Sequence, residues 1–407
     1  MNGPILSRRT VLGVFGLGAA AAAAGCGSSV GGGGSGGGGG SSSGGGGSIK
    51  VGLVIPQDGV YTPLGVDMQN AWELYLEQND GMLGGYEVET IIADEGETPD
   101  TGVPAISGLI QRDQVDVLVG VVNSATALGS AEAVTAAKKL LIVANAGAGA
   151  ITAADTRSPY IWRTSFTNAQ VARALGGYLA EQDIPGGVYV MAADYAAGQE
   201  AVAGFRAEYE GAGGTIAGEA FTPFGTTQDF QPFLSGIQGS GAGATFVFYA
   251  GGEAVSYVQQ YASFGIKEVV PLYGSGFLSE GGVLNAQGEA ALGVQTSLHY
   301  TSELDNEANV AFREAYQGAY EDAVPTCYSV QTWDAALVLD QVLADVDGLD
   351  GDTLSEALGS LGEISDSPRG AWTFNGQSPE QMFYLREVTD SGGALVNSVS
   401  EELGTFA

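Results

Sequence analysis

The strongest constraint on the fold is a repeated alternation of short apolar runs with amphipathic segments, which begins at Ile49. The runs "IKVGLVI", "YEVETIIAD" and "VDVLVGVV" are rich in β-branched residues, and each is followed by a segment with apolar residues at helical spacing. The alternation restarts at "GGVYVMAA" and continues through "ATFVFYA". Continuous apolar strands that alternate with helices are typical of parallel sheets covered on both faces. The sequence therefore predicts an α/β fold with two doubly wound parallel-sheet domains.

The break between the two domains is predicted near "SPYIWRTSFTNAQ", residues 158–170. In doubly wound sheets, ligands bind outside the carboxyl ends of the strands and next to helix N-termini. Two such edges that face each other form a cleft, and the 17 tyrosines supply amphipathic side chains suited to its walls. We therefore expect a ligand site between the domains.

The first 48 residues resemble an export signal and a tether. Arg8 and Arg9 precede an apolar run from Val11 to Ala24, which is shorter than the ~20 residues needed to span a bilayer. The segment "SRRTVL" resembles a twin-arginine motif, and "AAGC" resembles a lipobox in which Cys26 receives a diacylglyceryl group.

From these motifs we predict a signal peptide over residues 1–25, and a lipidated Cys26 with a Gly/Ser tether over 26–48. The lipid would anchor the exported body on the outer face of the cytoplasmic membrane, at the cell surface or in the periplasm. A core helix that ends in a chance cysteine is the alternative.

Composition limits the partners of the body. The chain has 47 acidic and 14 basic residues, a net charge of −33, and no basic patch, so we expect no binding to nucleic acid. Once Cys26 carries lipid, Cys327 is the one remaining cysteine, which we interpret as a small buried apolar residue without a disulfide partner.

Enzyme chemistry is not expected either. The single histidine, His299, offers neither a zinc cluster nor a base beside a serine nucleophile. The segment "GSGAGA" precedes a strand-like run, whereas a dinucleotide-binding loop follows one. We predict a binding protein with no metal and no cofactor.

The segments "VDVLVGVVNSATALGSAEAV", "ADYAAGQEAVAGFRAEYEGAGG" and "TTQDFQPFLSGIQGSGAGATFVFYAGGEA" carry a resemblance through their order and spacing. From about residue 49 to 390 the chain resembles the type I periplasmic binding proteins, in the Leu/Ile/Val-binding branch of ABC-transporter receptors. The resemblance implies two discontinuous lobes, 49–164 with 298–370 and 165–297 with 371–407. Three crossovers near Thr164, Ser297 and Gly370 would form a hinge.

The same resemblance implies a solute-binding protein whose lobes close on a small hydrophobic amino acid of the branched-chain type and deliver it to ABC permease subunits. In this family, the first lobe holds the ligand carboxylate through hydroxyl and backbone N–H groups. That role falls on Ser124, with Thr126 close behind, although both could simply cap a helix. Asn145, Ala146 and Gly147 fall on the next loop, where the family offers a backbone carbonyl and amide and where a plain turn is the alternative.

In the second lobe, Tyr195 stands at the family's cleft aromatic position, with a core tyrosine as the alternative, and Tyr61 of the first lobe is a weaker candidate. Gly276 and Gly252 stand where the family has an amine-binding acid and another tyrosine. Glu253 could pair with an ammonium group, whereas Tyr195 and Phe277 could wall a larger apolar tail.

The ligand class therefore stays open between a hydrophobic amino acid and an aromatic or other hydrophobic carboxylate or amide. A ligand-sensing domain is a further alternative, because this fold also serves in receptors.

Overall fold

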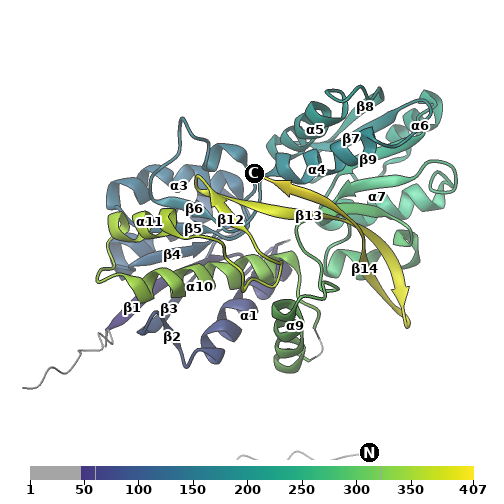
Figure 1. Cartoon of the computed structure of the whole chain (residues 1–407). Helices are drawn as coiled ribbons and strands as arrows, with labels where there is room; N and C mark the ends of the chain where they lie inside the picture. Colours follow the sequence, from purple (N-terminus) through teal and green to yellow (C-terminus); the bar gives the residue numbers. More distant parts are fainter. Residues whose placement is uncertain (1–46, 60, 322) are drawn as a thin grey trace, which may run out of the picture. The chain divides into compact units, whose positions relative to one another are not determined.

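The computed structural model describes residues 47–59, 61–321 and 323–407. The predicted signal peptide, Cys26 and the tether up to residue 46 lie outside this part of the chain. Within it, the elements form two lobes, each built on one sheet (Figure 1). The predicted α/β class with two mainly parallel sheets is confirmed.

Lobe 1 contains a six-stranded sheet in the order β2-β3-β1-β4-β5-β6. Its strands are β1 (Ser48–Ile55), β2 (Met82–Leu83), β3 (Tyr86–Asp94), β4 (Val117–Gly120), β5 (Leu140–Val143) and β6 (Ile161–Arg163). All neighbours pair in parallel except β2 with β3. The carboxyl ends of β1, β3, β4 and β5 therefore meet at one edge of the sheet.

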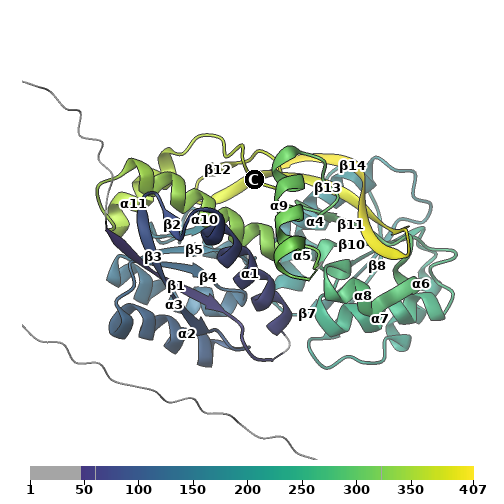
Figure 2. The ribbon, with the colours of Figure 1, turned by 90° about the horizontal axis from the view of Figure 1, so that it is seen from below.

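Helices cover both faces of the lobe 1 sheet (Figure 2). One face packs against α1 (Thr62–Gln78), α10 (Cys327–Asp345) and α11 (Gly351–Ser360), with α9 (Glu307–Ala319) beside α1. The other face packs against α2 (Pro99–Gly108), its π-helical extension η1 (Leu109–Asp113) and α3 (Ser124–Ala137), and the short η2 (Gly149–Ile151) lies against α3. Two-sided coverage explains why β4 and β5 are buried along their whole length.

Lobe 2 contains an eight-stranded sheet in the order β12-β13-β11-β10-β9-β7-β8, with β14 paired to β13. Its strands are β7 (Val188–Asp194), β8 (Ile216–Pro223), β9 (Ala244–Phe248), β10 (Leu272–Ser275), β11 (Gln295–Leu298), β12 (Thr373–Asn375), β13 (Ser378–Ser391) and β14 (Ala394–Phe406). The first five pair in parallel, and β13 adds an antiparallel edge to β11, with β12 and β14 antiparallel to β13.

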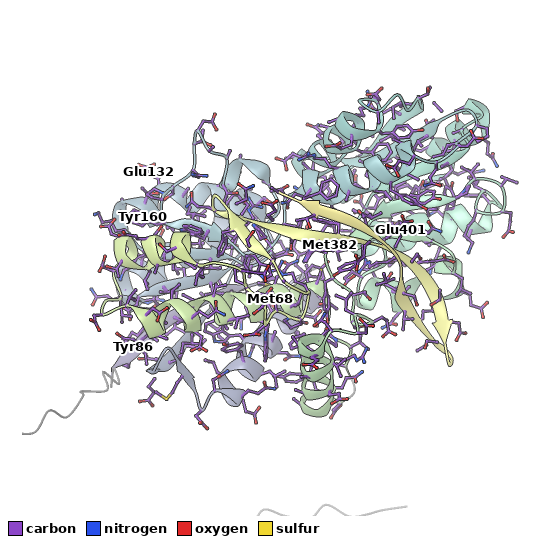
Figure 3. All side chains as sticks on the ribbon, in the orientation of Figure 1. Met68, Tyr86, Glu132, Tyr160, Met382 and Glu401 are labelled. Carbon is purple, nitrogen blue, oxygen red and sulfur yellow. The ribbon has the colours of Figure 1, made fainter. Side chains whose placement is uncertain are left out.

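Helices also cover both faces of this sheet. One face packs against α4 (Asn168–Ala180) and α5 (Ala196–Tyr209), and the other against α6 (Gln231–Ser240), α7 (Gly251–Ser263) and α8 (Gly282–Gln287). The short helices η3 (Gly276–Ser279) and η4 (Gly288–Ala291) lie beside α7 and α8. In both lobes, apolar side chains such as that of Met68 are buried between helix and sheet, whereas Glu132 and Glu401 are exposed at the surface (Figure 3).

Local sequence signals start several helices at the positions observed. The Thr167 and Gln170 side chains form a reciprocal capping box at the start of α4. Asn123 caps α3 by accepting the N–H groups of Ala125 and Thr126. Gly120 ends β4 with a φ of +125°, and a Cβ there would lie 2.1 Å from the Val54 carbonyl oxygen, so the turn before α3 requires glycine.

The chain passes between the lobes in three places, between β6 and α4, between β11 and α9, and between α11 and β13. Arg369 joins two of these passages. Its buried guanidinium pairs with Asp334 of α10 at 2.5 Å, donates to the Thr164 carbonyl at 2.6 Å, and donates to the Gln381 side chain of β13 at 2.5 Å. A single cation thus ties one helix of lobe 1 to two of the connecting segments.

His299 and Cys327 both lie near these passages and are fully buried. Burial lowers the pKa of His299, and the positive charges of Arg369 and Arg386 lower it further, so the ring is neutral near pH 7. Its Nε2 lies 3.1 Å from the Gln331 side chain. The predicted burial of Cys327 is confirmed, and among the described residues it has no disulfide partner.

Candidate functional site

The carboxyl ends of the lobe 1 strands bring four loops together. Tyr61 precedes α1 in the loop after β1, Glu95 follows β3, Ser124 follows β4, and Asn145 follows β5. The parallel pairing of β3, β1, β4 and β5 places these loops at the same edge. The edge is therefore polar and includes most of the first-lobe residues that the sequence singled out.

Ser124 is the first residue of α3, so its N–H has no partner within the helix. Its hydroxyl oxygen accepts the N–H of Ala148 at 3.1 Å. A hydroxyl that accepts one hydrogen bond can still donate its own proton. This amide without a partner in the helix, the hydroxyl proton and the positive end of α3 together suit an anionic group.

Thr126 lies elsewhere on the same helix. Its side chain is fully buried and packs against Gly102 of α2. The contact is so close that a Cβ added at Gly102 would come within 2.4 Å of the Thr126 methyl group. Its hydroxyl has no hydrogen-bond partner among the described residues. The structure therefore places Thr126 in the contact between α2 and α3.

Glu95 is a site residue that the sequence did not single out. It is fully buried, and its two carboxylate oxygens accept the N–H groups of Val122 and Asn123, each at 2.7 Å. Burial raises the pKa of Glu95 to about 7, although these two hydrogen bonds lower it. The acid therefore fixes the loop before Ser124 and can change its charge near neutral pH. Its position directly after a strand was the signal available in the sequence.

The loop after β5 is held largely by its backbone. The Ala146 carbonyl accepts from the buried Arg163, and the Gly147 carbonyl accepts from the N–H of Asn168 at 2.8 Å. A Cβ at Gly147 would lie 2.5 Å from both the Asn168 side chain and Phe166, which explains the glycine. Asn145 is 7 % exposed, and its side-chain oxygen has no partner among the described residues, so it can accept from a ligand.

The corresponding edge of lobe 2 is aromatic. Tyr195 follows β7 and precedes α5, and its ring stacks on Phe224, with centroids 4.1 Å apart and planes at 16°. Phe248 at the end of β9 lies 6.4 Å from the Tyr195 ring. Phe277 in η3 is 6 % exposed and lies 6.1 Å from Phe248.

Side chains of both lobes meet at these two edges. Phe277 of lobe 2 lies 6.5 Å from the ring of Tyr328, which is in the first turn of α10 in lobe 1. Burial raises the pKa of Tyr328 and of Tyr195, and in both cases the nearby Tyr61 contributes to the shift. From Tyr195 through Phe248 and Phe277 to Tyr328, the ring centroids lie 6.1 to 6.5 Å apart, and Tyr61 is near enough to Tyr195 and Tyr328 to act on them electrostatically. We call these five residues the interlobe aromatic cluster.

Glu253 lies in the first turn of α7, and its Oε1 accepts the N–H of Gly225 at 2.9 Å in the loop after β8. Partial burial raises the pKa of Glu253, and the hydrogen bonds from Gly225 and Thr227 lower it. Its charge also raises the pKa of Tyr61, after burial and the charges of Glu95 and Glu97. Glu253 thus lies close to the aromatic cluster while its carboxylate holds a loop.

The two glycines of lobe 2 differ in their surroundings. A Cβ at Gly276 would lie 2.6 Å from Leu298 and 2.7 Å from the Arg386 guanidinium, so an acid could not replace it without rearrangement. At Gly252 a Cβ would have open space. Position 276 therefore has neither a carboxylate that could bind an amine nor the space for one.

No group of three or more histidine, cysteine or acidic side chains is placed to hold a metal ion in residues 47–407, leaving aside 60 and 322. In the same part of the chain, none of the helices combines the length and the apolar character needed to cross a bilayer. Taken together, the loops described above offer hydrogen-bonding groups from lobe 1 and aromatic side chains from lobe 2.

Comparisons with known proteins agree with this arrangement. Residues 48–394 match the family described as "Periplasmic binding protein". The sequence is 27% identical over 366 residues to the Leu/Ile/Val-binding protein homolog 6 of Brucella melitensis biotype 1, covering 88% of this chain and 91% of that protein.

Two solved structures are more similar in sequence. The ABC-transporter solute-binding protein from R. palustris in complex with benzoate is 34% identical, with a TM-score of 0.79, and the match covers 89% of this chain and 98% of that chain. A solute-binding protein from Rhodopseudomonas palustris BisB5 in complex with 3,4-dihydroxybenzoic acid is 31% identical, with a TM-score of 0.80, and the match covers 88% and 97%. The chain belongs to the type I periplasmic binding proteins, in the Leu/Ile/Val-binding family of ABC-transporter solute-binding proteins.

Proposed function

We propose that this solute-binding protein captures a small aromatic carboxylate of the benzoate type between its two lobes. The observation that carries the proposal is the interlobe aromatic cluster, in which the ring of Phe277, beside Phe248 and Tyr195 of lobe 2, lies 6.5 Å from Tyr328 of lobe 1. Aromatic side chains pack well against a planar ring, in offset or edge-to-face geometry. The R. palustris relative at 34% identity, which binds benzoate, supports the same class.

In this proposal lobe 1 binds the ligand carboxylate. The Ser124 hydroxyl and amide lie at the N-terminus of α3, where a negative charge is favoured. Glu95, which accepts the N–H groups of the two residues before that helix, Val122 and Asn123, would favour the anion when it is protonated. The Asn145 oxygen would accept from a hydroxyl group or a bridging water on the ligand.

The second candidate is a hydrophobic amino acid of the branched-chain type. One observation favours it. Besides burial, the charges of Glu95, Glu97 and Glu253 all raise the pKa of Tyr61, and a negative environment of this kind attracts an ammonium group. Gly276 weighs against it, since no acid fits at that position.

A thermal-shift screen tests the two candidates against each other. A ligand that binds the folded state raises Tm in proportion to RT ln(1 + [L]/Kd). We would compare benzoate, 4-hydroxybenzoate and 3,4-dihydroxybenzoate with leucine, isoleucine, valine, phenylalanine and their deaminated acids. A shift with the benzoates and none with leucine is expected. A shift with leucine and none with its deaminated analogue would overturn the proposal in favour of the amino acid.

We also propose that the body is lipid-anchored through Cys26 after twin-arginine export, and that it delivers its ligand to ABC permease subunits. The sequence "AAGC" and the glycine-rich segment behind it support the anchor. In the native host, Cys26→Ser should release the body from the membrane fraction into the periplasm or medium. A variant that stays in the membrane fraction would show that another anchor exists.

A further inference from the structure

Phe224 is an exposed aromatic residue that packs against a residue of the candidate site, Tyr195. It follows β8 directly, is 46 % exposed, and covers one side of the Tyr195 ring. A large apolar side chain at the surface loses hydrophobic stabilisation unless it has a packing role. The stack on Tyr195, with nearly parallel rings 4.1 Å apart, is the packing role that the structure offers.

The loop that carries Phe224 is fixed to its neighbour α7. The N–H of Gly225, which has a φ of +72°, donates to Oε1 of Glu253 at 2.9 Å. The hydroxyl of Thr227 donates to the Pro223 carbonyl at 2.8 Å, and the Gln260 amide donates to the Gln228 carbonyl at 2.7 Å. The loop is therefore held at both ends, and Glu253 holds the end next to Phe224.

This use of Glu253 differs from a role as an amine receptor. A carboxylate that accepts backbone N–H groups has its lone pairs partly occupied, and a neutral amide oxygen can make the same bond. An ammonium ligand, by contrast, would need the charge of Glu253. The variant Glu253→Gln therefore separates the two roles.

We propose that Phe224 and Glu253 are positioning residues for Tyr195, and that through this ring they set the preference of the site for planar ligands. Glu253 fixes the loop, the loop places Phe224, and Phe224 restricts the Tyr195 ring to one orientation. A fixed aromatic wall favours a flat ring over a puckered one of similar volume. The preference for a flat ring rests on the proposed function, whereas the positioning of Tyr195 does not.

The experiment compares benzoate with cyclohexanecarboxylate, its non-planar analogue, by calorimetry on the full-length protein. Phe224→Ala should weaken benzoate binding by about tenfold, the upper range for an aromatic pair, while cyclohexanecarboxylate changes less. Phe224→Tyr should restore benzoate binding to within threefold. Phe264→Ala removes another exposed phenylalanine, at the end of α7, and should change neither ligand.

Glu253→Ala should weaken benzoate binding as Phe224→Ala does, and Glu253→Gln should bind nearly as the parent protein. Equal loss in both Glu253 variants would instead show that the charge is needed and would overturn the loop-fixing role. Unchanged benzoate affinity and preference in folded Phe224→Ala would overturn the role of Phe224.

A measurement without ligand keeps the proposal independent of the ligand class. Stacking on Phe224 shifts the Tyr195 ring protons in the NMR spectrum, and Phe224→Ala should move these signals, assigned with Tyr195→Phe. If the parent protein binds leucine and ignores benzoate, the proposed function falls, and the same variants measured with leucine still test the positioning. Tyr195 signals that do not move in Phe224→Ala would overturn the stack itself.

Discussion

Both lobes contribute the carboxyl ends of parallel strands to the candidate site, but the two sheet edges differ in chemistry. In lobe 1 the loops after β3, β4 and β5 present Glu95, Ser124 and Asn145, with hydrogen-bonding groups fixed by a helix terminus and by backbone contacts. In lobe 2 the loops after β7 and β8 present Tyr195 and Phe224, fixed by ring packing. One edge can orient a charged group, and the other can select the shape of an apolar body.

The two edges can act on one ligand only while the connecting segments hold the lobes together. Among the substitutions considered, loss of Arg369 should destabilise these segments most. Arg369→Met leaves Asp334 buried with its charge unpaired, which costs about 3–5 kcal/mol of unfolding free energy. Chemical denaturation would measure the loss. Arg112→Met removes the exposed partner of Asp113 and should leave the denaturation midpoint unchanged. An equally small effect at Arg369 would show that the hinge does not depend on this pair.

The polar role of lobe 1 is tested at Ser124. In Ser124→Ala, loss of a hydrogen bond to a charged group should weaken binding of a carboxylate ligand by about 1.5–3 kcal/mol, roughly ten- to a hundredfold. Calorimetry on the folded variant measures this. Ser130→Ala, in the same helix, removes a hydroxyl that has no partner among the described residues and serves as the control. Undiminished affinity in Ser124→Ala would remove Ser124 from the site.

Glu95 makes the polar edge sensitive to pH. The pKa of its carboxyl group is raised to about 7, so it is mainly neutral at pH 6 and mainly charged at pH 8. Affinity for benzoate should therefore increase as pH falls from 8 to 6, by no more than about tenfold per pH unit for one linked proton. Calorimetry at each pH measures the trend, and Glu95→Gln should flatten it. Glu132→Gln, at an exposed position of α3, should keep it. An amino acid whose ammonium group lies near Glu95 would show the opposite trend.

Substitution of Thr126 should have the smallest effect on ligand affinity. It tests whether the polar edge includes this residue. Because its buried hydroxyl has no partner among the described residues, Thr126→Val should leave affinity unchanged and alter stability by less than ~1 kcal/mol. Thr126→Ala would leave a gap beside Gly102 and lower Tm. A clear loss of ligand affinity in folded Thr126→Val would return Thr126 to the list of ligand contacts.

The sequence predicts the class of fold and the strand ends well, because both follow from hydrophobic periodicity over many residues. The resemblance to the family singles out Ser124, Asn145 and Tyr195, and the structure places them in the loops that follow β4, β5 and β7. Their roles toward a ligand stay predictions. Thr126 shows the limit, because one helical position decides whether a side chain faces the sheet edge or the neighbouring helix.

Glu95, Phe224 and Tyr328 were not predicted, for a physical reason. Each acquires its significance from a partner far away in the sequence, namely Asn123, Tyr195 and Phe277. A single sequence contains many acids that follow a strand and many aromatic residues in loops. Only the tertiary contacts distinguish these residues from others of the same type.

The interleaving of the two lobes has a consequence for how the chain reaches this structure. Strand β1 precedes the other described elements in the chain, yet the sheet face to which it belongs is covered by α10, and the lobe 2 sheet acquires its edge only when β13 and β14 are available. Neither half of the chain can bury its core alone, and contacts between such distant segments slow folding. Residues 307–407 therefore complete both lobes. Without them, one face of the lobe 1 sheet lacks its helices and the lobe 2 sheet lacks its edge strands, and such exposed apolar surface and strand edges are prone to aggregate.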